Sequence, residues 1–152
     1  MKRLIPIWLI ACTVLLPACT SDVVYSQFSP ILSEGWHMDS VLRFAYSIPD
    51  TTPDYNMTIY VRHKENYPYQ NIWLFAGDSV HRDTLQCYLA DDRGRWMGDK
   101  HHGIVEMPVF IGTNCHFSRT GIYTMEIQHA MRDTVLRGVM DIGLEIKRYG
   151  KE

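Results

Sequence analysis

The chain has 152 residues and a formal net charge of −2, and its lysines and arginines are scattered rather than clustered. This distribution excludes the basic footprint of a nucleic-acid-binding protein, so nucleic acid is not an expected partner. The length fits a single domain with a hydrophobic core of its own and is short for two.

The first predicted element is an export signal. Residues 2–3 are basic, residues 4–16 are almost wholly apolar, and Pro17 and Ala18 supply a break and a small residue where a signal peptidase can cut. The apolar run is too short to span a membrane, because a spanning helix needs about 20 such residues. We therefore expect residues 1–18 to be removed from the mature protein.

Cys19 follows this signal directly, at a point where ordinary cleavage has no use for a thiol. Residues 16–19, Leu-Pro-Ala-Cys, resemble the bacterial lipobox, in which the cysteine receives a diacylglyceryl group and becomes the new N-terminus. Two or three acyl chains anchor a protein stably without a transmembrane helix. Cys19 is the predicted lipidation site, and the alternative is a plain secretory signal with an incidental cysteine. We expect residues 19–28 to be the lipidated N-terminus with a short tether, and residues 29–152 to be one domain.

The mature sequence predicts short strands separated by turns. Most of them alternate apolar and polar residues, which is the side-chain period of a strand with one buried face. The clearest are residues 41–48, 57–62, 72–76, 84–89, 105–111, 123–128 and 142–147. Many short strands with almost no helical pattern predict an all-β fold, an antiparallel β-sandwich of about seven or eight strands, jelly-roll or immunoglobulin-like.

Two cysteines, Cys87 and Cys115, belong to the mature domain. In an exported domain they can form one disulfide, which would contribute on the order of 3 kcal/mol through loop entropy. Both also lie in or beside predicted strands, where free cysteines are commonly buried. The sequence leaves both alternatives open. Neither cysteine has the C-x-x-C partner that is typical of a zinc site.

No motif for catalysis or metal binding emerges. His101 and His102 form the densest histidine pair, but adjacent residues on a strand point to opposite faces, so a solvated loop is the simpler interpretation. The sequence lacks a G-x-S-x-G elbow. Residues 91–96 lack the alternating oxygen ligands of a calcium loop and instead predict a tight turn, with Gly94 at positive φ. We therefore predict a non-enzymatic protein without metal or cofactor.

Aromatic residues are the candidate contacts. Trp36, Tyr67, Tyr69 and Trp96 could offer contact area to a partner protein or flat rings to sugars. The alternative for Trp36 and Trp96 is packing over the ends of the sandwich. Trp73, inside a continuously apolar strand, is predicted to lie in the core.

Several motifs in fixed order carry a resemblance to a known family. They are residues 35–39 (GWHMD), 66–71 (NYPYQN), 91–98 (DDRGRWMG), 128–132 (QHAMR) and 139–144 (VMDIGL). Behind a lipobox, and over nearly the whole mature chain, they resemble the gliding motility lipoprotein GldH family of the Bacteroidetes. The resemblance implies a cell-envelope lipoprotein with no known catalytic activity. In gliding relatives it is required for gliding and linked to the apparatus that exports and moves surface adhesins. Only Cys19 carries over as a functional residue.

The predicted function is therefore that of a non-enzymatic envelope lipoprotein. It would support gliding motility or the associated envelope and secretion machinery through protein–protein contacts, and the alternative is a glycan-binding lipoprotein that uses exposed aromatics. Expected partners are the membrane, through the lipid anchor, and other envelope, gliding or secretion proteins. Residues 20–23 lack the acidic cluster often associated with surface display in this group, which favours the outer membrane facing the periplasm.

Overall fold

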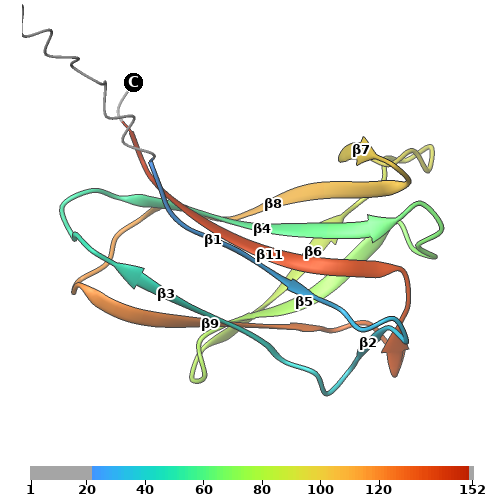
Figure 1. The fold of residues 1–152 in the computed structure, drawn as a ribbon, viewed down its shortest axis with the longest axis horizontal. Helices are drawn as coiled ribbons and strands as arrows, with labels where there is room; N and C mark the ends of the chain where they lie inside the picture. The colour runs from blue at the N-terminus through green and yellow to red at the C-terminus, as the bar shows by residue number, and fades with distance from the viewer. Residues whose placement is uncertain (1–21, 151–152) are drawn as a thin grey trace, which may run out of the picture.

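The computed structural model describes residues 22–150, and they form two antiparallel sheets packed into a sandwich (Figure 1). The described range contains no helix, and hence none that could cross a membrane. The strands are β1 (Val23–Pro30), β2 (Trp36–His37), β3 (Leu42–Ile48), β4 (Tyr55–Lys64), β5 (Asn71–Gly77), β6 (Arg82–Tyr88), β7 (Asp99–His101), β8 (Ile104–Cys115), β9 (Gly121–His129), β10 (Val135–Leu136) and β11 (Val139–Arg148). The predicted all-β sandwich is confirmed.

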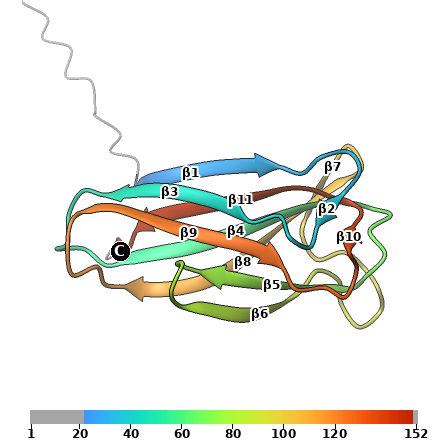
Figure 2. The ribbon, with the colours of Figure 1, turned by 90° about the horizontal axis from the view of Figure 1, so that it is seen from below.

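The strand order shows whether the β-sandwich is a jelly roll or immunoglobulin-like. One sheet has the order β1-β11-β4-β8-β7, the other has β3-β9-β5-β6, and β2 pairs with β10 in a short ribbon. Among the eight long strands, every connection except the β5–β6 hairpin crosses from one sheet to the other. This is the topology of a jelly roll, built from two Greek keys. Figure 2 shows the long strands of both sheets running along the long axis of the molecule.

The core lies between the sheets and follows from the alternation in the sequence. On β3, Phe44, Tyr46 and Ile48 are buried, as predicted, while the residues between them are exposed. From the facing sheet, Ile59 on β4 and Leu144 on β11 are fully buried. Burying a side chain of this size contributes about 1.5–3 kcal/mol, so these two facing rows hold the sandwich together.

The first strand corrects the predicted tether. We expected residues 19–28 to precede the domain, but β1 starts at Val23 and pairs with β11 along its length. Ser26, Gln27 and Ser29 interrupt the apolar alternation of β1. Such a pattern is typical of an edge strand, which is held by main-chain hydrogen bonds and buries little. The folded domain therefore begins at residue 23. The predicted signal peptide and Cys19 lie outside the described residues.

Both ends of the described chain lie at one end of the sandwich, called here the terminal end (Figure 1). Val23 pairs with Lys147 there, and the Tyr149 amide donates to the Asp54 carbonyl at 2.7 Å. The loops 49–54 and 116–120 also lie there. The opposite end, called the distal end, is formed by loops 31–41, 65–70, 89–98 and 130–138.

The two cysteines are free thiols, so the disulfide alternative is wrong. Cys87 is buried on β6, whereas Cys115 ends β8 in the other sheet, and its sulfur lies against Gly112 of its own strand. Burial raises the pKa of the Cys87 thiol to about 11. The thiolate is the reactive form, so Cys87 is chemically inert at neutral pH.

Candidate binding surface

Three of the four predicted contact residues form one aromatic cluster at the distal end. The ring centroids of Tyr67 and Tyr69 are 5.9 Å apart with their planes inclined by 77°, and those of Tyr67 and Trp96 are 6.4 Å apart at 52°. Trp36 is absent from this cluster and packs edge-on against His129, with centroids 5.3 Å apart. Neither of the two ring contacts in the cluster is parallel.

Burial removes two of these residues from the candidate surface. Trp36 is 1% exposed and Tyr67 is 4% exposed, so the prediction that they contact a partner is wrong. Their polar tips are satisfied within the chain, because the Trp36 indole donates to the Ser40 carbonyl at 3.0 Å and the Tyr67 hydroxyl donates to the Asn71 carbonyl at 3.1 Å. Both residues brace the distal loops from inside, which is the structural alternative left open for Trp36.

Trp96 is positioned by a tight turn. The backbone of Gly94 has a φ of +78°, as predicted, and its amide donates to the Asp91 carbonyl at 3.0 Å. The Asp91 carboxylate accepts a further hydrogen bond from the Arg95 amide at 2.8 Å. This turn places Trp96 half-buried over the ring of His63, with centroids 4.5 Å apart, so only part of the indole is open to a partner.

A hollow of about 540 Å³ opens beside Tyr69, on the four-stranded sheet near the distal end. It is lined by Tyr69, Asn71, Trp73, Ala130, Met131 and Arg132. Tyr69 is 37% exposed, and its hydroxyl donates to the Asp133 carboxylate at 2.8 Å. The hollow thus combines aromatic faces with amide and guanidinium groups, a mixture typical of protein-contact surfaces.

Trp73 is the functional candidate that sequence reasoning missed. It was predicted to lie in the core, but it is 36% exposed and forms part of this hollow. Ile72, Leu74 and Ala76 are the buried face of β5, so Trp73 and Phe75 point outward. A short run of apolar residues hides its own alternation. The signal that could have revealed the outward orientation of Trp73 is the small Ala76, which continues the every-second-residue row of buried side chains that begins at Ile72.

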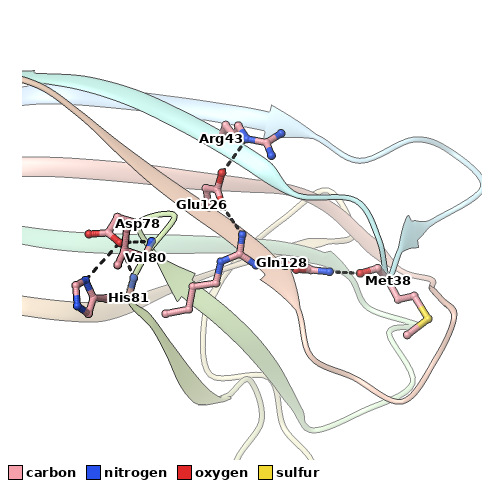
Figure 3. Close-up of polar contacts among 8 residues, drawn as sticks. Met38, Arg43, Asp78, Val80, His81, Glu126 and Gln128 are labelled. Atoms are coloured by element: carbon pink, nitrogen blue, oxygen red, sulfur yellow. Dashed lines mark hydrogen bonds and ion pairs between the residues drawn. The ribbon is translucent and has the colours of Figure 1, made fainter.

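A charged cluster occupies the outer face of the same sheet (Figure 3). The Arg43 guanidinium on β3 donates to the Glu126 carboxylate on β9 at 2.9 Å, and Arg82 on β6 binds the other carboxylate oxygen. Hydrogen bonds from Arg82 and Arg43 lower the pKa of Glu126, which is therefore ionised. Gly77 on β5 pairs with both Glu126 and Arg82, and because it has no side chain, Arg82 can reach across β5.

The turn between β5 and β6 is fixed by Asp78. One Asp78 carboxylate oxygen accepts hydrogen bonds from the amides of Val80 at 2.7 Å and His81 at 2.6 Å (Figure 3). These hydrogen bonds lower the pKa of Asp78 and keep it charged. The Gln128 side-chain amide, on the neighbouring β9, donates to the Met38 carbonyl and ties the sheet to the distal loop 31–41.

Two histidines, His63 and His129, are buried beneath the distal loops. Burial lowers the pKa of each, so both rings are neutral at pH 7. His63 Nδ1 donates to the Lys64 carbonyl at 2.9 Å, and His129 Nε2 donates to the Trp36 carbonyl at 3.0 Å. Among residues 22–150, no three His, Cys, Asp or Glu side chains gather so that they could hold a metal ion.

The fold and this surface define a class of protein: a jelly-roll domain whose exposed features are an aromatic hollow and a charged sheet face. The chain belongs to the GldH lipoprotein family, whose model matches residues 23–146. Membership of a lipoprotein family associates the chain with the cell envelope.

Two relatives cover nearly the whole chain. A gliding motility lipoprotein GldH homolog from Christiangramia forsetii is 29% identical over 147 residues, which cover 89% of this chain and 90% of that protein. The gliding motility lipoprotein GldH of Flavobacterium johnsoniae is 28% identical over 152 residues, which cover 92% of this chain and 94% of that protein.

Proposed function

We propose that this protein is a non-enzymatic lipoprotein, anchored by lipid on Cys19 to the outer membrane and facing the periplasm. In this role it supports gliding motility or the associated envelope and secretion machinery through protein–protein contacts. Membership of the GldH lipoprotein family is the observation that carries this proposal. The names of the two relatives support the motility part of it.

The length of the tether between Cys19 and β1 indicates which end of the sandwich would lie near the membrane. Val23, the first residue of β1, is four residues beyond Cys19. Four extended residues span at most about 14 Å, so an acyl anchor on Cys19 would hold the terminal end of the sandwich close to the membrane. The distal end then points away from the membrane and is accessible to other envelope proteins.

The contact surface in this proposal is the distal hollow with its two exposed aromatics, Tyr69 and Trp73, and the open part of Trp96. Aromatic side chains beside an arginine are typical of the residues that dominate protein–protein binding energy. Tethering in the membrane plane raises the effective concentration of a partner held in the same membrane, so contacts of modest affinity suffice.

Glycan binding by the predicted residues is not favoured by this geometry. A sugar-stacking platform needs exposed rings that lie in nearly the same plane. Trp36 and Tyr67 are buried, and the planes of Tyr67 and Tyr69 are inclined by 77°. Tryptophan fluorescence that remains unchanged across a panel of cell-wall glycans is the expected result.

The test uses the full-length protein with a C-terminal affinity tag in its native host, beside a Cys19→Ala variant. Cys12→Ala, which changes a cysteine within the signal and leaves residues 16–19 intact, is the matched control. We expect the wild type and the Cys12 variant to fractionate with the outer membrane and to recover motility or secretion proteins after mild crosslinking. The Cys19 variant should leave the membrane fraction and lose those proteins. Equal fractionation of all three would contradict the lipid anchor.

A further inference from the structure

The edge of the five-stranded sheet that lies opposite β1 is formed by β8, and β7 covers only part of it. β7 pairs its three residues, Asp99–His101, with Ile104–Glu106 at the start of β8. In the described part of the chain, no strand pairs with residues 107–115 on that side. The main-chain amides and carbonyls on the outer side of this stretch are therefore open to pairing with another strand.

The composition of this edge is unusual for an exposed one. Residues 107–115, Met-Pro-Val-Phe-Ile-Gly-Thr-Asn-Cys, contain no charged side chain, and Phe110 is 72% exposed. Natural edge strands are commonly protected by lysines, by other charges or by being short. Pro108 removes one donor close to the covered part, so the stretch best suited to pairing is residues 109–113.

An apolar hollow lies directly behind this edge. β1 and β3 contact each other on one side of the sandwich, whereas β8 and β6 border a hollow of about 130 Å³ on the other. Its lining is mostly apolar, including Met57, Leu85, Ile111 and Met125, and also contains Asp83. A space of this size takes one small apolar group. An added strand could insert an apolar side chain there while its neighbours point outward.

We propose that the open edge of β8 receives an extended strand from a partner protein, which adds to the five-stranded sheet in antiparallel pairing. Main-chain hydrogen bonds to residues 109–113 would supply affinity, and an apolar side chain in the hollow behind Ile111 would supply specificity. This inference deepens the proposed function and rests on the lipid anchor for the choice of partner.

The anchor excludes a second copy as the occupant. Antiparallel pairing of two β8 strands reverses one molecule relative to the other along the strand axis. Because β8 runs along the long axis, the two terminal ends would point in opposite directions (Figure 2). A tether of about 14 Å holds both terminal ends at one membrane, so the two copies cannot pair in this way.

The test is site-specific photocrosslinking in cells that carry the full-length protein. The photoreactive amino acid p-benzoyl-phenylalanine replaces Phe110 or, in a second variant, Thr113, both exposed on β8. The control position is Ile122, which is 80% exposed on β9 in the other sheet. We expect the Phe110 and Thr113 probes to label one segment of a partner protein. Because the added strand is antiparallel to β8, the residue labelled from position 113 should lie about three residues before the residue labelled from position 110 in the partner's sequence. The Ile122 probe should not label that segment.

Substitution gives a second readout. Phe110→Lys places on the exposed edge the kind of charge that protects natural edge strands from pairing, and should lower recovery of that partner about tenfold. Ile122→Lys should leave recovery unchanged, and thermal melting of both variants shows whether they fold. Labelling of a second copy, labels without the directional shift, or unchanged recovery with Phe110→Lys would overturn the edge proposal. If the wild type recovers envelope proteins in any of those cases, only the edge proposal fails, whereas recovery of none contradicts the proposed function itself.

Discussion

The face around Arg62 on the five-stranded sheet and the hollow beside Trp73 on the four-stranded sheet are built differently. On the five-stranded sheet, Arg62 binds the Glu106 carboxylate, lies 3.7 Å from the Asp141 carboxylate and stacks 3.8 Å from the ring centroid of Phe28. One cation thus links strands β1, β4, β8 and β11. On the four-stranded sheet, Trp73 and Phe75 remain more than one-third exposed.

This difference indicates which of these two regions is available for binding. Where charged side chains already satisfy one another, a partner must break those contacts before it gains any. Exposed aromatic side chains lose only water on binding. We therefore assign stability to the face around Arg62 and binding to the hollow beside Trp73. The predictions below test that division.

The largest expected effect on stability comes from Gly77, which lies beneath the charged cluster of the four-stranded sheet. A Cβ added to Gly77 would lie 2.0 Å from the His81 carbonyl oxygen, so Gly77→Ala forces the β5–β6 hairpin apart. We expect a loss of about 2–3 kcal/mol in the free energy of unfolding, measured by chemical denaturation. Gly121→Ala is the control, since nothing lies within 4 Å of its Cβ position. It should lose less, about 1 kcal/mol, for its φ of +136°. Equal losses would contradict the steric explanation.

Mild acid is expected to lower the free energy of unfolding through the two buried histidines rather than through the charged groups on the sheet faces. Burial lowers the pKa of His63 and His129 in the folded protein, so below about pH 6.5 the unfolded chain binds protons that the folded chain does not. The free energy of unfolding should therefore fall as pH drops from 6.5 to 5. The pKa of Glu126 is lowered, so its contribution is lost only at more acidic pH.

The pH prediction is measured as the slope of melting temperature against pH. His129→Gln should reduce the slope even if it also lowers the melting temperature. A wild-type melting temperature that stays constant between pH 7 and 5 would show that the buried rings do not couple to folding.

The binding assignment predicts an effect on partner recovery without an effect on the fold. Replacing Tyr69 and Trp73 together by alanine should reduce recovery of the crosslinked partner at least about tenfold, because aromatic residues in a hollow commonly dominate binding energy. The melting temperature should change little, since both side chains are more than one-third exposed. Lys147→Ala, on the opposite sheet, is the control for binding and should keep full recovery. Loss of recovery with Lys147→Ala instead would reverse the assignment of the two faces.

These expectations also show what the sequence could and could not predict. Local alternation predicted β3 and its buried face, because Phe44 and Tyr46 recur every second residue. It failed for β1, whose position depends on main-chain pairing with β11 rather than on a buried face. The outward orientation of Trp73 was hidden because its neighbours on β5 are also apolar.

Contacts between distant strands were beyond sequence reasoning altogether. The hydrogen bond between Arg82 and Glu126 depends on the pairing register of three strands and on the gap left by Gly77, and nothing local in the sequence specifies that register. Trp36 is buried for a similar reason, since His129 packs against it from a strand that is far away in sequence. Which aromatic residues are buried, and therefore which can contact a partner, depends on how distant strands are arranged in the fold.

The smallest predicted effect concerns Arg62. Arg62→Ala removes the partner of Glu106 and Asp141 and the cation over Phe28, but its side chain is 36% exposed, so solvent screens part of each interaction. We expect a loss of about 1 kcal/mol, or roughly 3–4 °C in melting temperature for a domain of this size. Partner recovery should be unchanged, because this face is assigned to stability. Arg62→Lys keeps the charge without the planar group and should restore part of the loss. Reduced recovery with an unchanged melting temperature would instead make Arg62 a binding residue and add the face around it to the contact surface.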